Sequence, residues 1–171
     1  MKDGDVTQAV TKQEMFAVIH ALTLRKVQNK ELWKLLMQPL IRNFNEGSIS
    51  LRELSSLTYD LYIIKLQSPR LYEIIVDYFI KQTFNESDLS QLGLRVSVNF
   101  LHSLMYCHGS LKHEGFFSVM RRFIMTNIDK FNRFQLIKLL DIYKYNSHFM
   151  SGQSDSGSRL KQLLEAQLEF K

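Results

Sequence analysis

The chain is poor in the residues that interrupt helices and in those that cross-link chains. Its 171 residues include one cysteine, two prolines and seven glycines. The lone cysteine, Cys107, excludes an intramolecular disulfide and fits a reducing compartment. Scarce proline and glycine favour helical segments. No apolar run approaches the roughly 18 residues that a transmembrane helix needs, so we expect no membrane partner.

The short motifs that accompany common catalytic and nucleotide-binding sites are also missing. The sequence contains no GxxxxGK[ST], GxGxxG, HExxH or GxSxG motif. Its aspartates are scattered, so no general acid–base pair is indicated. Cys107, His108 and His113 are metal-ligand types, but a second cysteine pair is absent and structural zinc takes four ligands. We therefore expect no enzymatic activity, cofactor, metal or small-molecule substrate.

What the chain does contain is a repeated apolar pattern. An apolar residue is followed three places later by a second and four places after that by a third. The four copies are Met15-Val18-Leu22, Leu54-Leu57-Leu61, Ser97-Phe100-Leu104 and Leu136-Leu139-Tyr143. Their starts, at positions 15, 54, 97 and 136, recur with a period of roughly 40 residues, as in helical repeat proteins. A helical spacing that recurs at this period predicts an all-α fold, an α-solenoid of about four stacked helical hairpins.

Helix starts are well marked in the sequence. Thr11–Glu14 and Ser50–Glu53 are capping boxes, and Asn132–Gln135 is a weaker version of the same signal. Ser68 places a cap residue before Pro69, which suits the first helical position. We expect eight helices, near residues 12–26, 30–44, 51–66, 69–83, 89–107, 112–127, 132–146 and 157–170.

The domain organisation follows from composition. We expect an N-terminal tail at 1–11, a helical-repeat domain at 12–150, a flexible linker at 151–158 and a linker-tethered C-terminal helix at 159–171. The last helix either folds back as a cap on the stack or docks on a partner. The predicted continuous core includes Leu57, Leu61, Ile75, Phe100, Leu104 and Leu139.

The repeated unit resembles a known class. It reads Leu-x-x-Leu-x-x-x-Leu, then Leu-aromatic-x-x-Ile/Leu, then Phe-Asn-Glu, as in Leu54–Leu61, Leu71–Ile75 and Phe84–Glu86. Over residues 12–146 it is similar to the octotricopeptide and heptatricopeptide repeats of organellar RNA-binding proteins, including RAP-domain and FAST-kinase-like proteins. The resemblance implies RNA binding or scaffolding in a mitochondrial or plastid assembly. The RAP domain that follows such repeats is not expected, because only the short polar-rich stretch 147–171 comes after them.

Charge points to an acidic partner such as RNA. Lys and Arg number 22 against 17 Asp and Glu, for a net charge of +5. The predicted phosphate-binding patch lies on the third and fourth units and comprises Lys112, Arg121, Arg122, Lys130 and Arg133. Its alternative is a solvated face. Residues 25–30 carry a smaller basic cluster at the first hairpin tip.

Aromatic side chains supply the second requirement of RNA binding, a surface for unpaired bases. The candidates are Tyr59, Tyr62 and Tyr72, although rings at helical spacing also fill cores. His20 and His102 are expected in the core or lining a groove.

These observations predict a non-catalytic helical-repeat subunit of a mitochondrial RNA–protein assembly, either a mitochondrial ribosome or an RNA-processing complex. Its partners would be RNA and other protein subunits, and its mitochondrial location follows from the family resemblance alone. The alternative is a protein–protein adaptor whose groove binds a partner helix without RNA contact.

Overall fold

The computed structural model of the protein describes residues 11–46, 49–66, 68–83, 92–146, 149 and 156–170. These residues form eight α-helices and one short 3-10 turn, with no strand, so the predicted all-α class is confirmed for the described part of the chain. The helices are α1 (Lys12–Leu24), α2 (Lys30–Asn45), α3 (Leu51–Ile63), α4 (Pro69–Gln82), α6 (Leu94–Cys107), α7 (Glu114–Thr126), α8 (Arg133–Tyr145) and α9 (Ser156–Glu169), and the 3-10 turn is η1 (Ile128–Lys130). The residues that would begin the predicted 89–107 helix, and the Phe84–Glu86 motif, lie outside the described residues.

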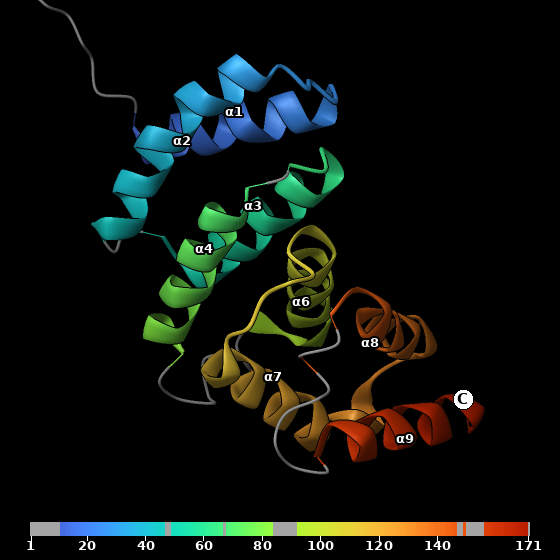
Figure 1. Cartoon of the computed structure of the whole chain (residues 1–171). Coiled ribbons are helices and arrows are strands. Elements are labelled where there is room, and N and C mark those ends of the chain that lie inside the picture. The colour runs from blue at the N-terminus through green and yellow to red at the C-terminus, as the bar shows by residue number, and fades with distance from the viewer. Residues whose placement is uncertain are drawn as a thin grey trace, which may run out of the picture.

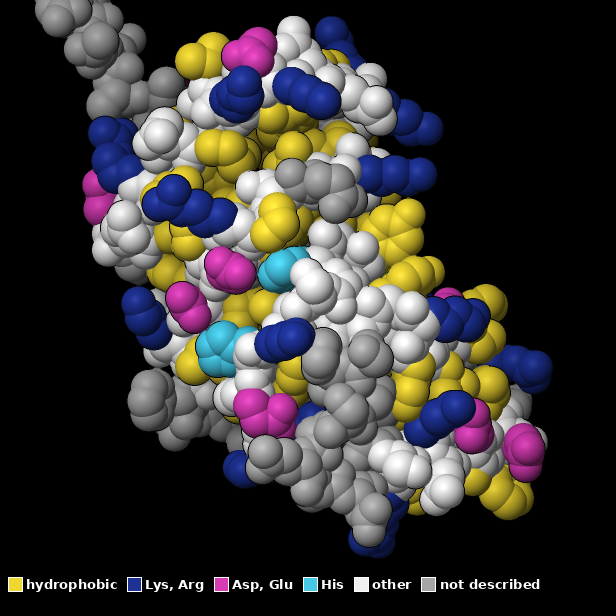
Figure 2. All heavy atoms as spheres, in the orientation of Figure 1, with side chains coloured by type: hydrophobic (Ala, Val, Ile, Leu, Met, Phe, Trp, Pro, Cys, Tyr) yellow, Lys and Arg dark blue, Asp and Glu magenta, His cyan; other side chains and the backbone are white. Residues whose placement is uncertain are grey.

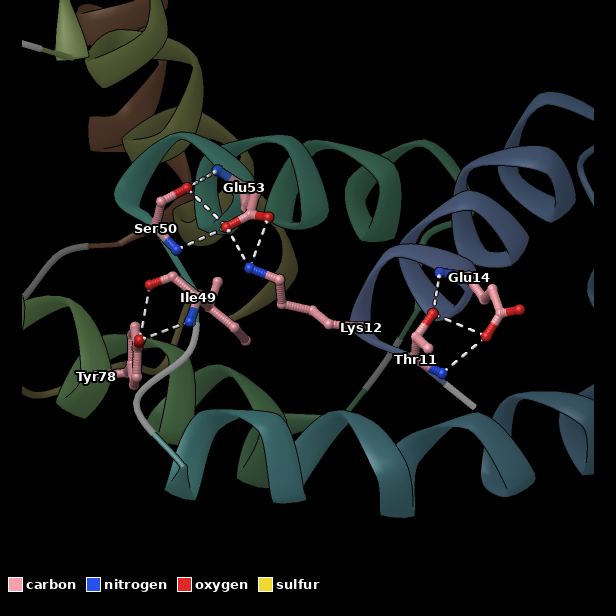
Figure 3. Close-up of polar contacts among 7 residues, drawn as sticks. All are labelled: Thr11, Lys12, Glu14, Ile49, Ser50, Glu53 and Tyr78. Atoms are coloured by element: carbon pink, nitrogen blue, oxygen red, sulfur yellow. Dashed lines mark hydrogen bonds and ion pairs between the residues drawn. The ribbon is translucent and has the colours of Figure 1, made fainter. Parts of the chain in front are cut away.

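The three capping boxes begin the helices that the sequence assigns to them. Figure 3 shows the first two, at Thr11 and Ser50, where the hydroxyl oxygen accepts the backbone N–H of a glutamate three residues later. The third box, at Asn132, begins α8. Lys12 also forms an ion pair with Glu53 at 3.0 Å, so the capping carboxylate of α3 holds the first turn of α1.

The helices pack in two successions (Figure 1). The first helix of each expected hairpin contacts the next first helix, α1 with α3, α3 with α6 and α6 with α8. The second helices do the same, α2 with α4, α4 with α7 and α7 with α9. Segments one repeat apart in the sequence are therefore neighbours in space.

The turns that join α1 to α2 and α3 to α4 have the same backbone geometry. Lys26 and Lys65 hold positive φ angles of 51° and 54°. The next residues, Val27 and Leu66, each donate a backbone N–H to a carbonyl five residues earlier, both at 3.0 Å. This is the Schellman arrangement, which satisfies the last carbonyls of a helix.

The predicted core is confirmed. Each of its six named members is buried: Leu57, Leu61, Ile75, Phe100, Leu104 and Leu139. The apolar pattern misplaces one residue, because Val18 is 43% exposed and Ile19 is buried in its place beside Met15. On α1 the buried residues Met15, Ile19 and Thr23 recur every four positions, an equally helical spacing that rotates the inward face by one residue.

The C-terminal helix lies against the body of the protein. Its Leu160 and Leu164 are fully buried, and α9 contacts α7, η1 and α8. Helix α9 begins at Ser156, so residues 156–158 of the predicted linker belong to its first turn. The rest of the predicted linker, 151–155, and residues 1–10 of the predicted tail lie outside the described residues.

Candidate nucleic-acid interface

Arg121 is not available at the surface, contrary to its place in the predicted basic patch. Its side chain is buried, with the whole residue only 7% exposed. The guanidinium Nη1 donates to the backbone carbonyl of Phe149 at 2.8 Å, and Nη2 pairs with Glu114 at the start of the same helix. A buried carbonyl needs a donor, and Arg121 supplies it, so the residue has an internal structural role.

The other four predicted residues are exposed but do not belong to one cluster. Arg122, Lys130 and Arg133 come from α7, η1 and the first position of α8. Lys130 Nζ donates to Asn127 Oδ1 at 3.2 Å. Lys112 precedes α7 and borders a separate hollow that Glu73 of α4 also lines. Arg122, Lys130 and Arg133 thus come from three consecutive elements, and their role in binding phosphates stays a prediction.

A more regular arrangement lies on the first helices. On each of α3, α6 and α8, a cation is followed seven places later by an aromatic or imidazole ring, which places both on one helical face. The pairs are Arg52 with Tyr59, Arg95 with His102 and Lys138 with Tyr145. From one of these helices to the next, the number of residues between the two cations is always the same, and it equals the number between the two rings. The same two chemical functions therefore recur on three helices that contact one another in order.

The rings join into a continuous aromatic row, which we define as Tyr59, Tyr62, His102, Tyr106 and Tyr145. The rings of Tyr59 and Tyr62 lie 6.0 Å apart, and Tyr62 contacts His102 at 5.8 Å and Tyr106 at 5.0 Å. Tyr145 closes the row against His102 at 5.8 Å and Tyr106 at 5.1 Å. The contacts between helices are edge-to-face, a favourable geometry for aromatic pairs. Tyr59 is 43% exposed and the other tyrosines are half-buried.

Two rings of this row, His102 and Tyr62, favour their neutral forms. Burial lowers the pKa of His102, nearby Lys138 lowers it further, and Asp141 opposes the shift. Burial and the neighbouring Tyr106 raise the pKa of Tyr62. Lys138 also donates to Asn99 Oδ1 at 2.6 Å, which holds its ammonium between α6 and α8. The cations and these two rings are thus separate chemical functions on neighbouring helices.

Two further residues that the sequence assigned to stacking or to a groove lie in contrasting environments. Tyr72 is fully buried, and its hydroxyl donates to the Leu66 carbonyl, so of the two alternatives for this ring the core position is the one observed. His20 is exposed on α1, and its Nδ1 lies 3.2 Å from both carboxylate oxygens of Asp60 on α3. Burial raises the pKa of Asp60, and the hydrogen bond to His20 opposes that shift.

The histidines near Cys107 form no metal site within the described residues, where no group of three or more potential ligands converges. Burial raises the pKa of the Cys107 thiol. His113 Nδ1 accepts the backbone N–H of Phe116 at 3.1 Å, so this ring caps the start of α7.

The motifs considered above do not single out five contributors: Arg52, Arg95, Lys138, Tyr106 and Tyr145. Their signal is present in the sequence as a constant spacing of cations and rings. The repeated apolar pattern hides this constant spacing, because the two patterns differ in period. The apolar copies that begin at Ser97 and Leu136 are four positions closer together in the sequence than the cations Arg95 and Lys138. Four positions are about one helical turn. The cation and ring of α8 therefore lie one turn later, relative to its apolar residues, than those of α6.

Comparison of the chain with protein-family models, with curated proteins and with solved structures gave no match. Among the described helices, none combines the length and the apolar character that crossing a bilayer requires.

Proposed function

We propose that this chain is a non-catalytic RNA-binding subunit built as a short α-solenoid of four hairpins. The order of helix contacts supports this architecture, since first helices meet first helices and second helices meet second helices. A stack of this kind presents an extended surface made of equivalent positions from successive repeats. Binding surfaces of repeat proteins use such rows.

The observation that carries the proposal is the aromatic row with its flanking cations. Single-stranded RNA is bound by rings that stack on splayed bases and by cations that neutralise phosphates. The row offers Tyr59 as its most exposed ring, and Arg52 and Arg95 lie about 10 Å toward the helix starts, given a rise of about 1.5 Å per residue. Neither arginine forms an ion pair with a described carboxylate, so both guanidinium groups remain available for phosphate oxygens.

The biological setting follows from the repeat resemblance together with this surface. We propose that the chain binds RNA as part of a mitochondrial RNA–protein assembly, a ribosome or a processing complex, and contacts neighbouring protein subunits there. Binding by stacking and backbone charge predicts weak sequence preference.

A salt titration with a fluorescein-labelled uridylate dodecamer tests the proposal. For single strands log K falls with log salt by about 0.7 for each phosphate neutralised, so Arg52→Glu with Arg95→Glu should flatten the slope by about 1.4. Affinity at low salt should fall at least about tenfold. Tyr59→Ser should weaken binding at every salt concentration, because stacking does not release counterions.

The matched control is Arg122→Glu with Arg133→Glu, which makes the same charge change at the sequence-predicted patch. If this control loses RNA binding and the Arg52/Arg95 variant keeps it, the interface lies on α7 and α8 instead. If neither variant changes binding, or the parent chain binds no RNA, the adaptor alternative replaces the proposal.

A further inference from the structure

Two hollows lie at equivalent places in successive repeats. The first, of about 620 Å³, opens between the start of α2 and the turn from α3 to α4. The second opens between the start of α4 and the loop from α6 to α7. Lys34 of the first hollow directly follows Trp33, and Glu73 of the second directly follows Tyr72, the equivalent ring of the next repeat.

The second hollow differs from the first because two carboxylates line it together with two imidazoles and Lys112. Glu73 and Asp77 point from α4 toward two histidines of the facing loop. His108 Nε2 lies 4.0 Å from Glu73 Oε1, and His113 Nε2 lies 3.4 Å from Asp77 Oδ1. Acidic and imidazole groups therefore meet inside this hollow, and Figure 2 shows histidine side chains beside acidic ones in the middle of this face.

The first hollow has charge of one sign only. Its rim carries Lys30, Lys34 and Lys65, and no carboxylate is among the described side chains that line it. Glu31, which does not line the hollow, pairs with Lys34 at 2.8 Å. Lys30 and Lys65 form no ion pair within the described residues. Like charges held around one concavity repel, and an anion placed between them removes that repulsion.

The floor of the first hollow is apolar. It is made by Trp33, Met37, Ile64 and Leu66, and Figure 2 shows apolar atoms ringed by Lys and Arg side chains over the upper part of this face. Methionine adapts its shape to different apolar partners. A volume of this size matches the usual range of binding pockets and accommodates large aliphatic or aromatic side chains.

We propose that the first hollow binds an acidic amphipathic helix of a neighbouring protein. Leucine or phenylalanine side chains of that helix would contact the floor, and its glutamates or aspartates would pair with the three lysines. Ser68, at the start of α4, also lines the hollow, and its hydroxyl makes no cap contact to the helix, so it can donate to a partner carboxylate.

The floor favours a peptide over RNA. Trp33 is only 3% exposed, and its indole Nε1 already donates to the Val27 carbonyl at 2.9 Å. The hollow therefore offers no open ring face on which a base could stack. This site is formed by the hairpin turns and the start of α2, and it does not depend on the aromatic row or on the RNA-binding proposal.

Trp33 is the sole tryptophan of the chain, so its fluorescence reports directly on occupancy of the first hollow. The full chain would be titrated with the acetylated peptide EELLEEFLEELL and, separately, with KKLLKKFLKKLL, which keeps the apolar residues and reverses the charge. We expect saturable change in Trp33 emission with the acidic peptide only. Lys30→Glu with Lys65→Glu should weaken this binding by at least about tenfold.

The charge-matched control is Lys81→Glu with Lys161→Glu, two exposed positions that do not line the hollow. This control should bind the acidic peptide within about twofold of the parent, since its cations are remote from the site. Equal binding of both peptides, or an unchanged affinity in the Lys30/Lys65 variant, would refute the proposal. A uridylate dodecamer that changes Trp33 emission and displaces the peptide would assign the hollow to RNA and overturn the peptide as its occupant.

Discussion

Trp33 and Tyr72 make the same contact one repeat apart. The indole Nε1 of Trp33 donates to the Val27 carbonyl at 2.9 Å, and the hydroxyl of Tyr72 donates to the Leu66 carbonyl at 2.8 Å. Each donor lies six places after its acceptor, so the whole contact is carried unchanged from one hairpin to the next. In α2 and in α4 the ring thus holds the turn that precedes its helix, although the two rings differ in chemistry.

Tyr72→Phe should lower the free energy of unfolding by about 1 kcal/mol, because it removes a donor from a partly buried carbonyl and leaves the ring in place. Urea denaturation followed by circular dichroism measures the change. Tyr59→Phe is the control, since Tyr59 is exposed, and it should change stability by less than about 0.5 kcal/mol. Equal losses in the two variants would mean that the Leu66 contact contributes nothing.

Arg121→Met should destabilise the fold by about 1–3 kcal/mol, because the Phe149 carbonyl loses a charged donor. Glu114 is mostly exposed and contributes little to the loss. RNA affinity, measured where the variant is folded, should stay within about twofold of the parent. If the Arg121→Met chain is stable but no longer binds RNA, Arg121 contacts RNA directly and the internal role is wrong.

Gly109→Ala should destabilise the chain by about 1–3 kcal/mol through overpacking. A Cβ at this position would overlap the backbone carbonyl oxygen of Tyr145, so the loop before α7 or the end of α8 must move. Gly115→Ala is the matched control inside α7, where the nearest atom to a Cβ would be 3.4 Å away on His113. Alanine there should be neutral or stabilising by up to about 1 kcal/mol. Thermal melts that rank the two variants in the opposite order would contradict this packing.

Stability should fall as the pH drops below about 6.5, the ordinary pKa of histidine. Burial lowers the pKa of His102, and burial lowers that of His108 against the opposing charge of Glu73. At pH values between the lowered histidine pKa of the folded chain and the ordinary pKa of the unfolded chain, the unfolded chain binds more protons. The stabilisation is therefore complete above about pH 6.5 and is lost as the pH falls.

Urea midpoints of the parent at pH 7.5 and 5.5 measure this loss. His102→Gln with His108→Gln should reduce the difference between the two midpoints, because glutamine does not titrate. A pH dependence that survives the double substitution would assign it to other groups.

Helix positions were predictable because their signals are local. Capping boxes at Thr11, Ser50 and Asn132 depend on residues three positions apart, and all three begin helices. The apolar period identifies the core for the same reason. Val18 was misplaced because residues three and four positions after Met15 are both one turn away. The choice between Val18 and Ile19 depends on how α1 sits on α3, which its own sequence does not encode.

The candidate interface was predictable only in its chemistry. The sequence indicates cations and rings, but the roles of individual residues depend on distant partners. Arg121 becomes internal because Phe149, 28 residues later, presents a carbonyl to it. Tyr72 becomes internal because its own hairpin turn supplies an acceptor. The aromatic row forms where α3, α6 and α8 meet, and no single window of sequence contains it.

Lysine at the two hairpin turns has a further consequence for engineering this protein. Lys26 and Lys65 hold a left-handed backbone that costs an L-residue roughly 1–2 kcal/mol and costs glycine almost nothing. Glycine at either position would relieve that conformational strain, but at position 65 it would also remove one of the three cations around the first hollow. Selection for heat resistance alone would therefore favour variants that lose partner recognition, whereas Lys26 can be exchanged for glycine without that conflict.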